Sequence, residues 1–275
     1  MILFGNESEK TGREEMIYLF FSVGLMVGFL GALLGVGGGI FLVPILTLLF
    51  KVPIKEAIGT SLLIVIATST AASGINLRSG LVDKRLAFPL LLFLTMGAVG
   101  GGLLAGVMKP EGLSILFGLV LAYTAASMGT AKKDKESIQA DELKSYEPKR
   151  WPLGLSTSIL AGGTSGLLGI GGGAVQVPIM YLIMGIPLKI SVATSNFMVG
   201  ITAAASVFIY YSRGDIDLLV TGPTAVGTFA GSLLGATLLP KVRSVYLRWL
   251  FGIVLFYLGS RMVLQGLHLS FSSLF

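Results

Sequence analysis

The chain has 275 residues, of which 53% are hydrophobic and only 12% are charged. Soluble domains carry about 25% charged residues, so this composition excludes a water-soluble globule and predicts an all-α polytopic membrane protein. The chain has no cysteine and a single histidine, which excludes disulfides and argues against a metal site or any other bound cofactor. The net charge of +6 comes from basic residues beside apolar segments, a pattern typical of membrane topology and not of nucleic-acid binding.

The N-terminal tail, residues 1–16, is net acidic and precedes the first apolar run. It lacks the basic segment that begins a cleavable signal peptide. We therefore expect the first membrane-spanning segment itself to direct the chain to the membrane.

Ten apolar runs follow the tail, in two groups of five. The expected repeat 1 spans residues 17–131, a polar linker spans 132–150, and repeat 2 spans 151–275, all within one integral membrane domain. The runs fall at about 17–35, 38–50, 60–76, 86–108, 112–131, 151–169, 172–184, 194–211, 218–240 and 246–266.

The two groups are copies of each other. Residues 33–45 read LLGVGGGIFLVPI and residues 167–179 read LLGIGGGAVQVPI, an offset of 134 residues that needs no gaps. The same offset relates Asp83 to Asp217. Unrelated apolar segments would not keep register through their loops, so the sequence contains a true internal repeat.

The triple glycines predict broken helices. Residues 17–50 would reach about 51 Å as one helix, whereas the hydrocarbon core is about 30 Å thick. We expect a turn at the glycines and a short helix from near Ile40, with the same arrangement in repeat 2. Ser and Thr are common N-caps, so Thr60-Ser61 and Thr194-Ser195 are expected to mark further helix starts.

Charges in the loops favour inverted repeats. The loop at 78–85 is basic in repeat 1, whereas in repeat 2 the excess of basic residues falls in the next loop, at 241–248. Matching loops thus prefer opposite sides, as five crossings per repeat would require. We expect a bacterial-type inner membrane, with the linker cytoplasmic and both termini external. Counting 17–50 as one element instead gives four crossings, parallel repeats and a cytoplasmic N-terminus; this alternative stays open.

A helix that starts within the membrane exposes several N–H groups and the positive end of its dipole, which together bind anions. Inverted repeats would bring two such starts toward one point. We therefore predict an oxyanion cradle built from the backbone of Gly37, Gly38, Gly39, Gly171, Gly172 and Gly173. Tight packing at a kink is the alternative interpretation.

Polar side chains near the breaks could complete this substrate-binding site. Hydroxyls come from Thr60, Ser61, Thr194 and Ser195, for which plain N-capping is a compatible role. Repeat 2 also carries Gln176 where repeat 1 has Leu42, and Asn196 where repeat 1 has Leu62. An intramembrane amide is costly without a partner, so each binds either substrate or a neighbouring helix.

The sequence lacks the residues that several classes of function require. No Asp or Glu lies in the middle of an apolar run, which argues against a metal-cation transporter and a carboxylate proton relay. The sequence has no nucleotide-binding GxxxxGK[ST] loop and no Ser-His-Asp set. We expect an anion site without catalytic residues, and no enzyme.

The motif LGVGGGIFLVPIL followed by GTS, repeated as LGIGGGAVQVPIM followed by ATS, resembles the sulfite exporter TauE/SafE family. The resemblance covers about residues 17–266. It implies a secondary transporter, often an exporter, for sulfite, sulfoacetate, organosulfonates or related small oxyanions, and a topology commonly given as seven or eight helices.

We therefore expect a secondary active transporter that moves a small anionic substrate across the lipid bilayer by alternating access. A coupled proton would have to travel on the substrate itself, because the sequence offers no carboxylate carrier. An anion channel with the same cradle and a non-transporting assembly or sensor component are the alternatives. Neither the motifs nor the resemblance sets the substrate, the direction, the coupling ion or the oligomeric state.

Overall fold

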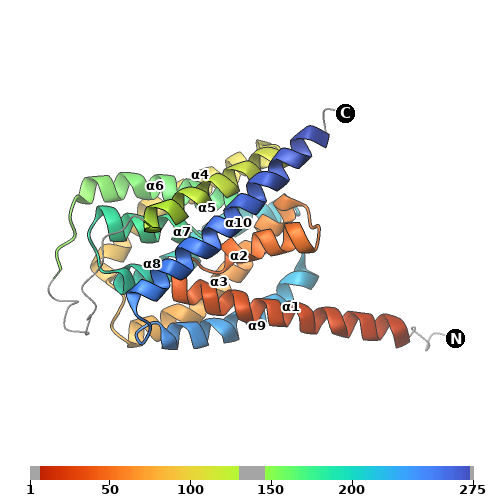
Figure 1. The fold of residues 1–275 in the computed structure, drawn as a ribbon, viewed down its shortest axis with the longest axis horizontal. Helices are drawn as coiled ribbons and strands as arrows, with labels where there is room; N and C mark the ends of the chain where they lie inside the picture. The colour runs from red at the N-terminus through yellow and green to blue at the C-terminus, as the bar shows by residue number, and fades with distance from the viewer. Residues whose placement is uncertain (1–6, 130–145, 273–275) are drawn as a thin grey trace.

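A computed structural model describes residues 7–129 and 146–272, and within these ranges the chain forms helices and no strand (Figure 1). The first half contains α1 (Glu7–Leu34), α2 (Gly39–Pro44), α3 (Ile54–Arg78), α4 (Lys84–Val107) and α5 (Pro110–Gly129). The second half contains α6 (Trp151–Leu168), α7 (Gly173–Pro178), α8 (Leu188–Ser212), α9 (Leu218–Leu238) and α10 (Ser244–Ser272). Residues 132–145 of the predicted linker, 132–150, lie outside the described residues.

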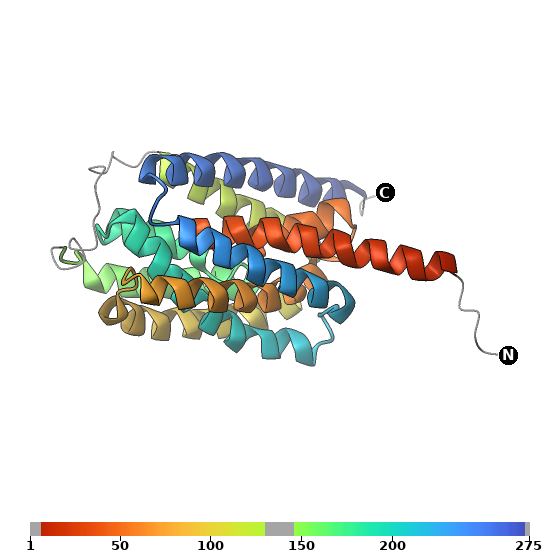
Figure 2. The same ribbon diagram turned by 90° about the horizontal axis from the view of Figure 1, so that it is seen from below.

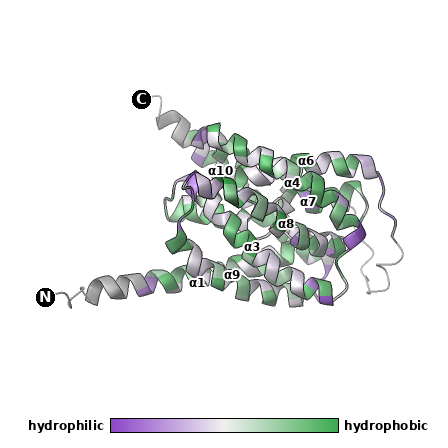
Figure 3. Ribbon diagram, turned by 180° about the vertical axis from the view of Figure 1, so that it is seen from behind, coloured by the Kyte–Doolittle hydropathy of each residue, from purple (hydrophilic) through white to green (hydrophobic). Residues whose placement is uncertain are grey.

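The predicted all-α polytopic membrane fold is confirmed. Six helices of the described chain are long and apolar enough to cross a membrane: α1 over Glu14–Leu34, α3, α4, α8, α9 and α10. Hydrophilic residues gather toward the two ends of the bundle, and hydrophobic residues dominate between them (Figure 3). The helices after the two breaks are shorter, at Gly39–Leu49 and Gly173–Ile183.

The two halves of the chain interlock. Helix α1 packs along α9, and the matching helix α6 packs along α4. Likewise α3 lies beside α8 and α5 beside α10, so the main neighbour of each long helix belongs to the other half. The halves are therefore repeats in sequence that share one packed core.

Glycines allow this close packing between the halves. A Cβ atom added at Gly28 of α1 would overlap the backbone of Thr228 on α9. One added at Gly162 of α6 would overlap the backbone of Leu94 on α4. Residues without side chains let two helix backbones approach each other where lipid supplies no hydrophobic driving force.

The start of α1 and the end of α10 lie at one end of the bundle (Figures 1 and 2). The end of α5 and the start of α6 lie at the opposite end, as do the α3–α4 and α9–α10 loops. We refer to these as the terminal end and the linker end. The predicted basic loops at 78–85 and 241–248 thus both fall at the linker end.

The residues that precede α6 bond to both halves of the chain at the linker end. The hydroxyl of Tyr146 donates a hydrogen bond to Oδ2 of Asp83, the residue that caps α4, and Lys149 N donates to Met184 O at 2.9 Å. Burial and the neighbouring Asp83 carboxylate raise the pKa of Tyr146 above its ordinary value. The phenol therefore keeps the proton that it donates.

Helices α3 and α8 begin earlier than predicted. They follow Pro53 and Pro187, whose ψ angles of 138° and 139° are extended. The prediction that Thr60-Ser61 and Thr194-Ser195 mark helix starts is therefore wrong, because these pairs lie in the second turn of their helices. Proline is compatible with a helix start, since its fixed φ suits the first turn and its missing N–H costs nothing there.

Candidate functional site

Both triple-glycine motifs break the chain between two helices, as predicted. The predicted helix start near Ile40 is confirmed, with α2 beginning at Gly39 and α7 at the matching Gly173. The backbone turns through left-handed conformations at three glycines in each break. Their φ values are 73° for Gly35, 76° for Gly37, 78° for Gly38, 69° for Gly169, 70° for Gly171 and 84° for Gly172. Residues with a Cβ seldom adopt these angles, so glycine is required.

The helices that follow the breaks start without a side-chain cap. Gly38 and Gly172 occupy the cap positions, and no side chain of the described residues accepts a hydrogen bond from the first turn. By contrast, α4 begins at Asp83, whose carboxylate accepts a hydrogen bond from Arg85 N at 2.9 Å. Phe41 N and Val175 N donate to the carbonyls of the cap glycines, Gly38 O and Gly172 O, at 3.0 Å and 3.2 Å. The amides before them, of Gly39 and Ile40 and of Gly173 and Ala174, have no acceptor within their helix.

A proline lies in each helix after its break, at Pro44 and Pro178. Directly after it the helix widens into a π-helical turn, Ile45–Leu49 in the first half and Ile179–Ile183 in the second. Proline has no N–H and its ring clashes with the carbonyl four residues earlier, which accounts for the change in winding. Each broken segment therefore continues as a short helix of two or three turns.

The two breaks contact each other in the core. A Cβ atom at Gly39 would overlap the carbonyl oxygen of Gly169, and one at Gly173 would overlap that of Gly35. Gly37 and Gly171 both face Val65, whose Cγ1 would lie 2.8 Å and 2.6 Å from their added Cβ atoms. The structure thus brings together Gly37, Gly39, Gly171 and Gly173 of the six predicted glycines, whereas Gly38 faces Val27 and Thr68 and Gly172 faces Leu94 and Ser165.

Two of the predicted hydroxyls hold the breaks in place. Ser61 Oγ donates to Gly169 O at 2.8 Å, and Ser195 Oγ donates to Gly35 O at 2.7 Å. Each serine therefore binds the first glycine of the break in the other half. Gly35 and Gly169 were not predicted as site residues, although the 134-residue offset pairs them.

The other two predicted hydroxyls lie apart from the breaks. Thr60 Oγ1 accepts a hydrogen bond from Asp217 N, and Thr194 Oγ1 accepts one from Asp83 N, both at 3.1 Å. These bonds tie α3 to the start of α9 and α8 to the start of α4. The threonines therefore hold helices of opposite halves together.

The predicted amide side chains are fully buried and only partly paired. Asn196 Nδ2 donates to Ala32 O at 2.8 Å, so the alternative interpretation as a contact between helices holds for this atom. Asn196 Oδ1 and both polar atoms of Gln176 have no hydrogen-bond partner in the described part of the chain. Buried polar groups are nearly always paired, so these atoms are free to bind a polar solute.

Ser165 belongs with this group, and sequence reasoning missed it. Its hydroxyl is fully buried and has no partner among the described residues. Its Cβ would lie 3.3 Å from a Cβ added at Gly172, the residue that caps α7. The repeat could have pointed to Ser165, because the first half has a glycine, Gly31, at the position where the second half has this hydroxyl.

A further buried amide lies toward the linker end of the first half. Asn76, near the end of α3, is fully buried, and neither of its side-chain polar atoms has a partner in the described chain. Its burial places it inside the bundle.

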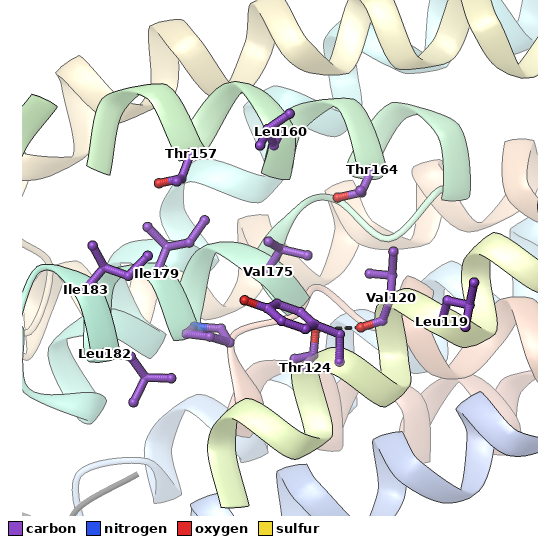
Figure 4. A pocket seen from close by; sticks show the side chains of 12 residues that line it. Leu119, Val120, Thr124, Thr157, Leu160, Thr164, Val175, Ile179, Leu182 and Ile183 are labelled. Carbon is purple, nitrogen blue, oxygen red and sulfur yellow. Dashed lines mark hydrogen bonds between the residues drawn. The ribbon is translucent and has the colours of Figure 1, made fainter. Parts of the chain in front are cut away.

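A cavity of about 450 Å³ lies between α5, α6 and α7 (Figure 4). Its hydroxyls come from Tyr123, Thr124, Thr157 and Thr164, and the rest of its lining is apolar. Thr124 Oγ1 donates to Val120 O at 2.8 Å, and the side chain of Tyr123 is 71% exposed. The cavity therefore opens at the outer surface of the bundle, and no break glycine lines it.

The chain is similar to known proteins along nearly its whole length. The model of the family described as "Sulfite exporter TauE/SafE" matches residues 20–262. A "Probable membrane transporter protein YunE" of Bacillus subtilis is 27% identical over 263 residues, covering 89% of this chain and 96% of that protein. A "Probable membrane transporter protein" of Xylella fastidiosa (strain 9a5c) is 31% identical over 219 residues, covering 78% and 82%.

A plant protein matches one part of the chain. The "Sulfite exporter TauE/SafE family protein 5" of Arabidopsis thaliana is 32% identical over 147 residues, covering 54% of this chain and 31% of the plant protein. No solved structure matches the chain significantly.

Proposed function

The chain belongs to the sulfite exporter TauE/SafE family of membrane transporters, and from this premise we propose that it is a secondary active transporter of a small oxyanion. Sulfite, sulfoacetate and organosulfonates are the proposed substrate class, and export is the proposed direction. The substrate would be held where the two breaks meet. No catalytic step is part of the proposal.

One observation supports this proposal most strongly: the two glycine breaks contact each other in the buried core, and each is followed by a helix start without a side-chain cap. Gly38 and Gly172 cap them without offering an acceptor. An anion would accept hydrogen bonds from the first-turn amides and would be favoured by both helix dipoles. In a site shielded from water these interactions are strong enough to replace much of the anion's hydration.

Unpaired side chains beside α7 support the same assignment. The Gln176 amide and the Ser165 hydroxyl lack partners in the described chain, and both can donate a hydrogen bond to an oxyanion. Neither is charged. A site made of backbone and neutral donors suits a carrier, because it can release its substrate as well as bind it.

Alternating access follows if the halves act as inverted repeats. We propose that they are inverted, because each half runs from one end of the bundle to the other in the opposite direction (Figures 1 and 2). Rocking of one half against the other would expose the breaks to the two sides in turn. The linker end would be cytoplasmic, in a bacterial-type inner membrane, because it carries the basic loops.

The test is transport by purified protein in liposomes loaded with radiolabelled sulfite. Gly172→Leu and Gly38→Leu should each reduce transport to background, because leucine at φ values of 84° and 78° is strained and would fill the cradle. Gly100→Leu is the matched control, since a Cβ there meets no atom within 4 Å. Wild-type rates in both break variants would overturn the site assignment.

Burial of the breaks supports a carrier over an anion channel with the same cradle. Every glycine from Gly37 to Gly39 and from Gly171 to Gly173 is buried. Counter-flow separates the two functions: unlabelled sulfite on the far side should accelerate exchange through a carrier and leave a channel unaffected. Absence of flux with every oxyanion would favour the non-transporting assembly or sensor role.

A further inference from the structure

A second cavity, of about 740 Å³, opens at the terminal end of the bundle. It lies between the first turn of α3, the start of α5 and the second half of α10. Lys51, Lys55, Glu56, Ser114, Asp215 and Gln265 contribute its polar and charged groups. None of the break glycines lines it, so it is separate from the central site.

Two polar atoms of this cavity have no partner in the described chain. Ser114 is fully buried and its Oγ is unpaired, and Oε1 of the half-buried Gln265 is unpaired as well. Buried hydroxyls without a hydrogen bond are rare in folded proteins, because burying a polar group without a partner is costly. A solute in the cavity that accepts a hydrogen bond would satisfy Ser114.

The N-terminus of α3 supplies a positive field at the same place. This helix has 25 residues and is capped by Pro53, which offers no side-chain acceptor. Its first turn, including Lys55, lines the cavity. Unpaired first-turn amides and a helix dipole attract anions, and here they act beside a buried hydroxyl that has no other partner.

Side-chain charges add to this field. Lys51 is exposed at the cavity, and Lys55 Nζ donates to Gly106 O at 3.0 Å. Asp215 is engaged by Arg213, with 3.0 Å between Oδ2 and Nε. Glu56 is thus the one cavity carboxylate without an ion pair among the described residues, set against two lysines.

The other half shows which of these features concern the ligand. Lys189 matches Lys55 and donates to Pro240 O at 2.7 Å, so this lysine bond is a shared structural feature. Lys51 and Glu56 are instead matched by Gly185 and Ile190. Lys51 and Glu56 therefore have no charged counterpart in the second half.

We propose that this cavity is a second anion subsite, which holds the transported oxyanion at the terminal mouth before or after it occupies the breaks. The proposal rests on the proposed function for the identity of the anion. The Ser114 hydroxyl, the first-turn amides of α3 and Lys51 would bind it. Glu56 would weaken binding and so keep the subsite from trapping its ligand.

Variants expected to change the KM for sulfite in opposite directions test the proposal. In liposomes of neutral lipid, Lys51→Ala and Ser114→Ala should each raise the KM for sulfite at the terminal side three- to tenfold at low ionic strength, with kcat retained. Glu56→Gln should lower the same KM severalfold. Salt near 0.5 M should shrink the Lys51→Ala effect, because screening weakens an exposed charge. A KM unchanged in all three variants would overturn the proposal.

Matched lysine variants separate binding from folding. Lys55→Met and Lys189→Met each remove one bond to a backbone carbonyl, but only Lys55→Met also removes a positive charge that lines the cavity, so only this variant should raise the KM. Equal effects of the two would contradict the subsite. Adding anionic lipid tests whether a headgroup phosphate competes with sulfite for the cavity. Competition would raise the KM of the wild-type protein and leave the KM of Lys51→Ala unchanged. A KM raised equally in both proteins would count against the cavity as the anion's site.

Direct binding distinguishes failure of this proposal from failure of the proposed function. If wild-type protein transports none of the oxyanions, the transporter assignment fails, and sulfite binding to purified full-length protein is then measured by calorimetry. Binding that Lys51→Ala weakens and Glu56→Gln strengthens would still support the subsite. Binding of equal strength in both variants, or none, would exclude it.

Discussion

The break before α2 and the break before α7 have nearly the same backbone but different surroundings. Both turn through three left-handed glycines, and each is held by a serine from the other half. Beside the first break, however, a Cβ at Gly31 would overlap the backbone nitrogen of Gly38. Beside the second, Ser165 occupies the matching position with a side chain and an unpaired hydroxyl. The second break therefore has room and polarity that the first lacks.

The same difference extends along the two short helices. Gln176 on α7 matches Leu42 on α2, and both side chains are fully buried. A symmetric backbone is thus combined with asymmetric chemistry. We propose that both breaks are needed for the fold, and that the second one would supply most of the side-chain contacts to an anion.

The variants with the largest expected loss of stability test the backbone contact that the two breaks make with each other. Gly39→Ala and Gly173→Ala should each lower the free energy of unfolding by about 1–3 kcal/mol or more and abolish transport, because each Cβ overlaps a backbone carbonyl of the opposite break. Thermal unfolding of purified protein measures the loss. Gly80→Ala, which has a φ of 68° but open space around it, should be the milder variant. A large loss of stability in only one of the two break variants would show that the breaks do not contribute equally to the fold.

An exchange at the short helices tests the part that differs. Gln176→Leu should reduce sulfite transport about tenfold, because it removes a side chain proposed to bind the anion. It should not lower stability, because the amide that it removes is buried without a partner. Leu42→Gln should cost about 1–3 kcal/mol of stability, since it buries a new unpaired amide. Transport rates and melting temperatures of the two variants measure this contrast. Similar behaviour of both would show that the breaks are chemically equivalent.

The smallest expected effect concerns the two serines. Ser61→Ala and Ser195→Ala should each cost about 1 kcal/mol, because each removes one hydrogen bond to a break carbonyl. Chemical denaturation should give similar losses for both. If either serine contacts the substrate instead, its alanine variant will change the KM for sulfite while stability stays constant.

The broken helices could be predicted because glycine is a local signal. Three glycines followed by Pro44 or Pro178 within apolar sequence indicate both the break and the restart, and the structure begins α2 within one residue of the expected position. The starts of α3 and α8 were misplaced because Thr60 and Thr194 looked like caps, whereas Pro53 and Pro187 precede the first turn. Two competing local signals were present, and the proline prevailed.

The roles of the hydroxyls could not be predicted from local signals. Ser61 reaches Gly169 and Thr60 reaches Asp217 only because the halves interlock. Sequence periodicity identifies repeats, but it does not say which helix of one half packs on which helix of the other. The unpaired Ser165 was missed for the same reason, since its position beside Gly172 depends on the packing of α6 against α7.

The most direct test of the central claim is the position of a bound oxyanion. Selenate, an analogue with a strong anomalous X-ray signal, can be located in crystals of the full chain. We predict a peak within hydrogen-bonding distance of the amides of Gly172 and Gly173 and of the Gln176 side chain, and loss of this peak in Gly172→Leu. An anomalous map with no peak at either break, under conditions where selenate competes with sulfite transport, would contradict it.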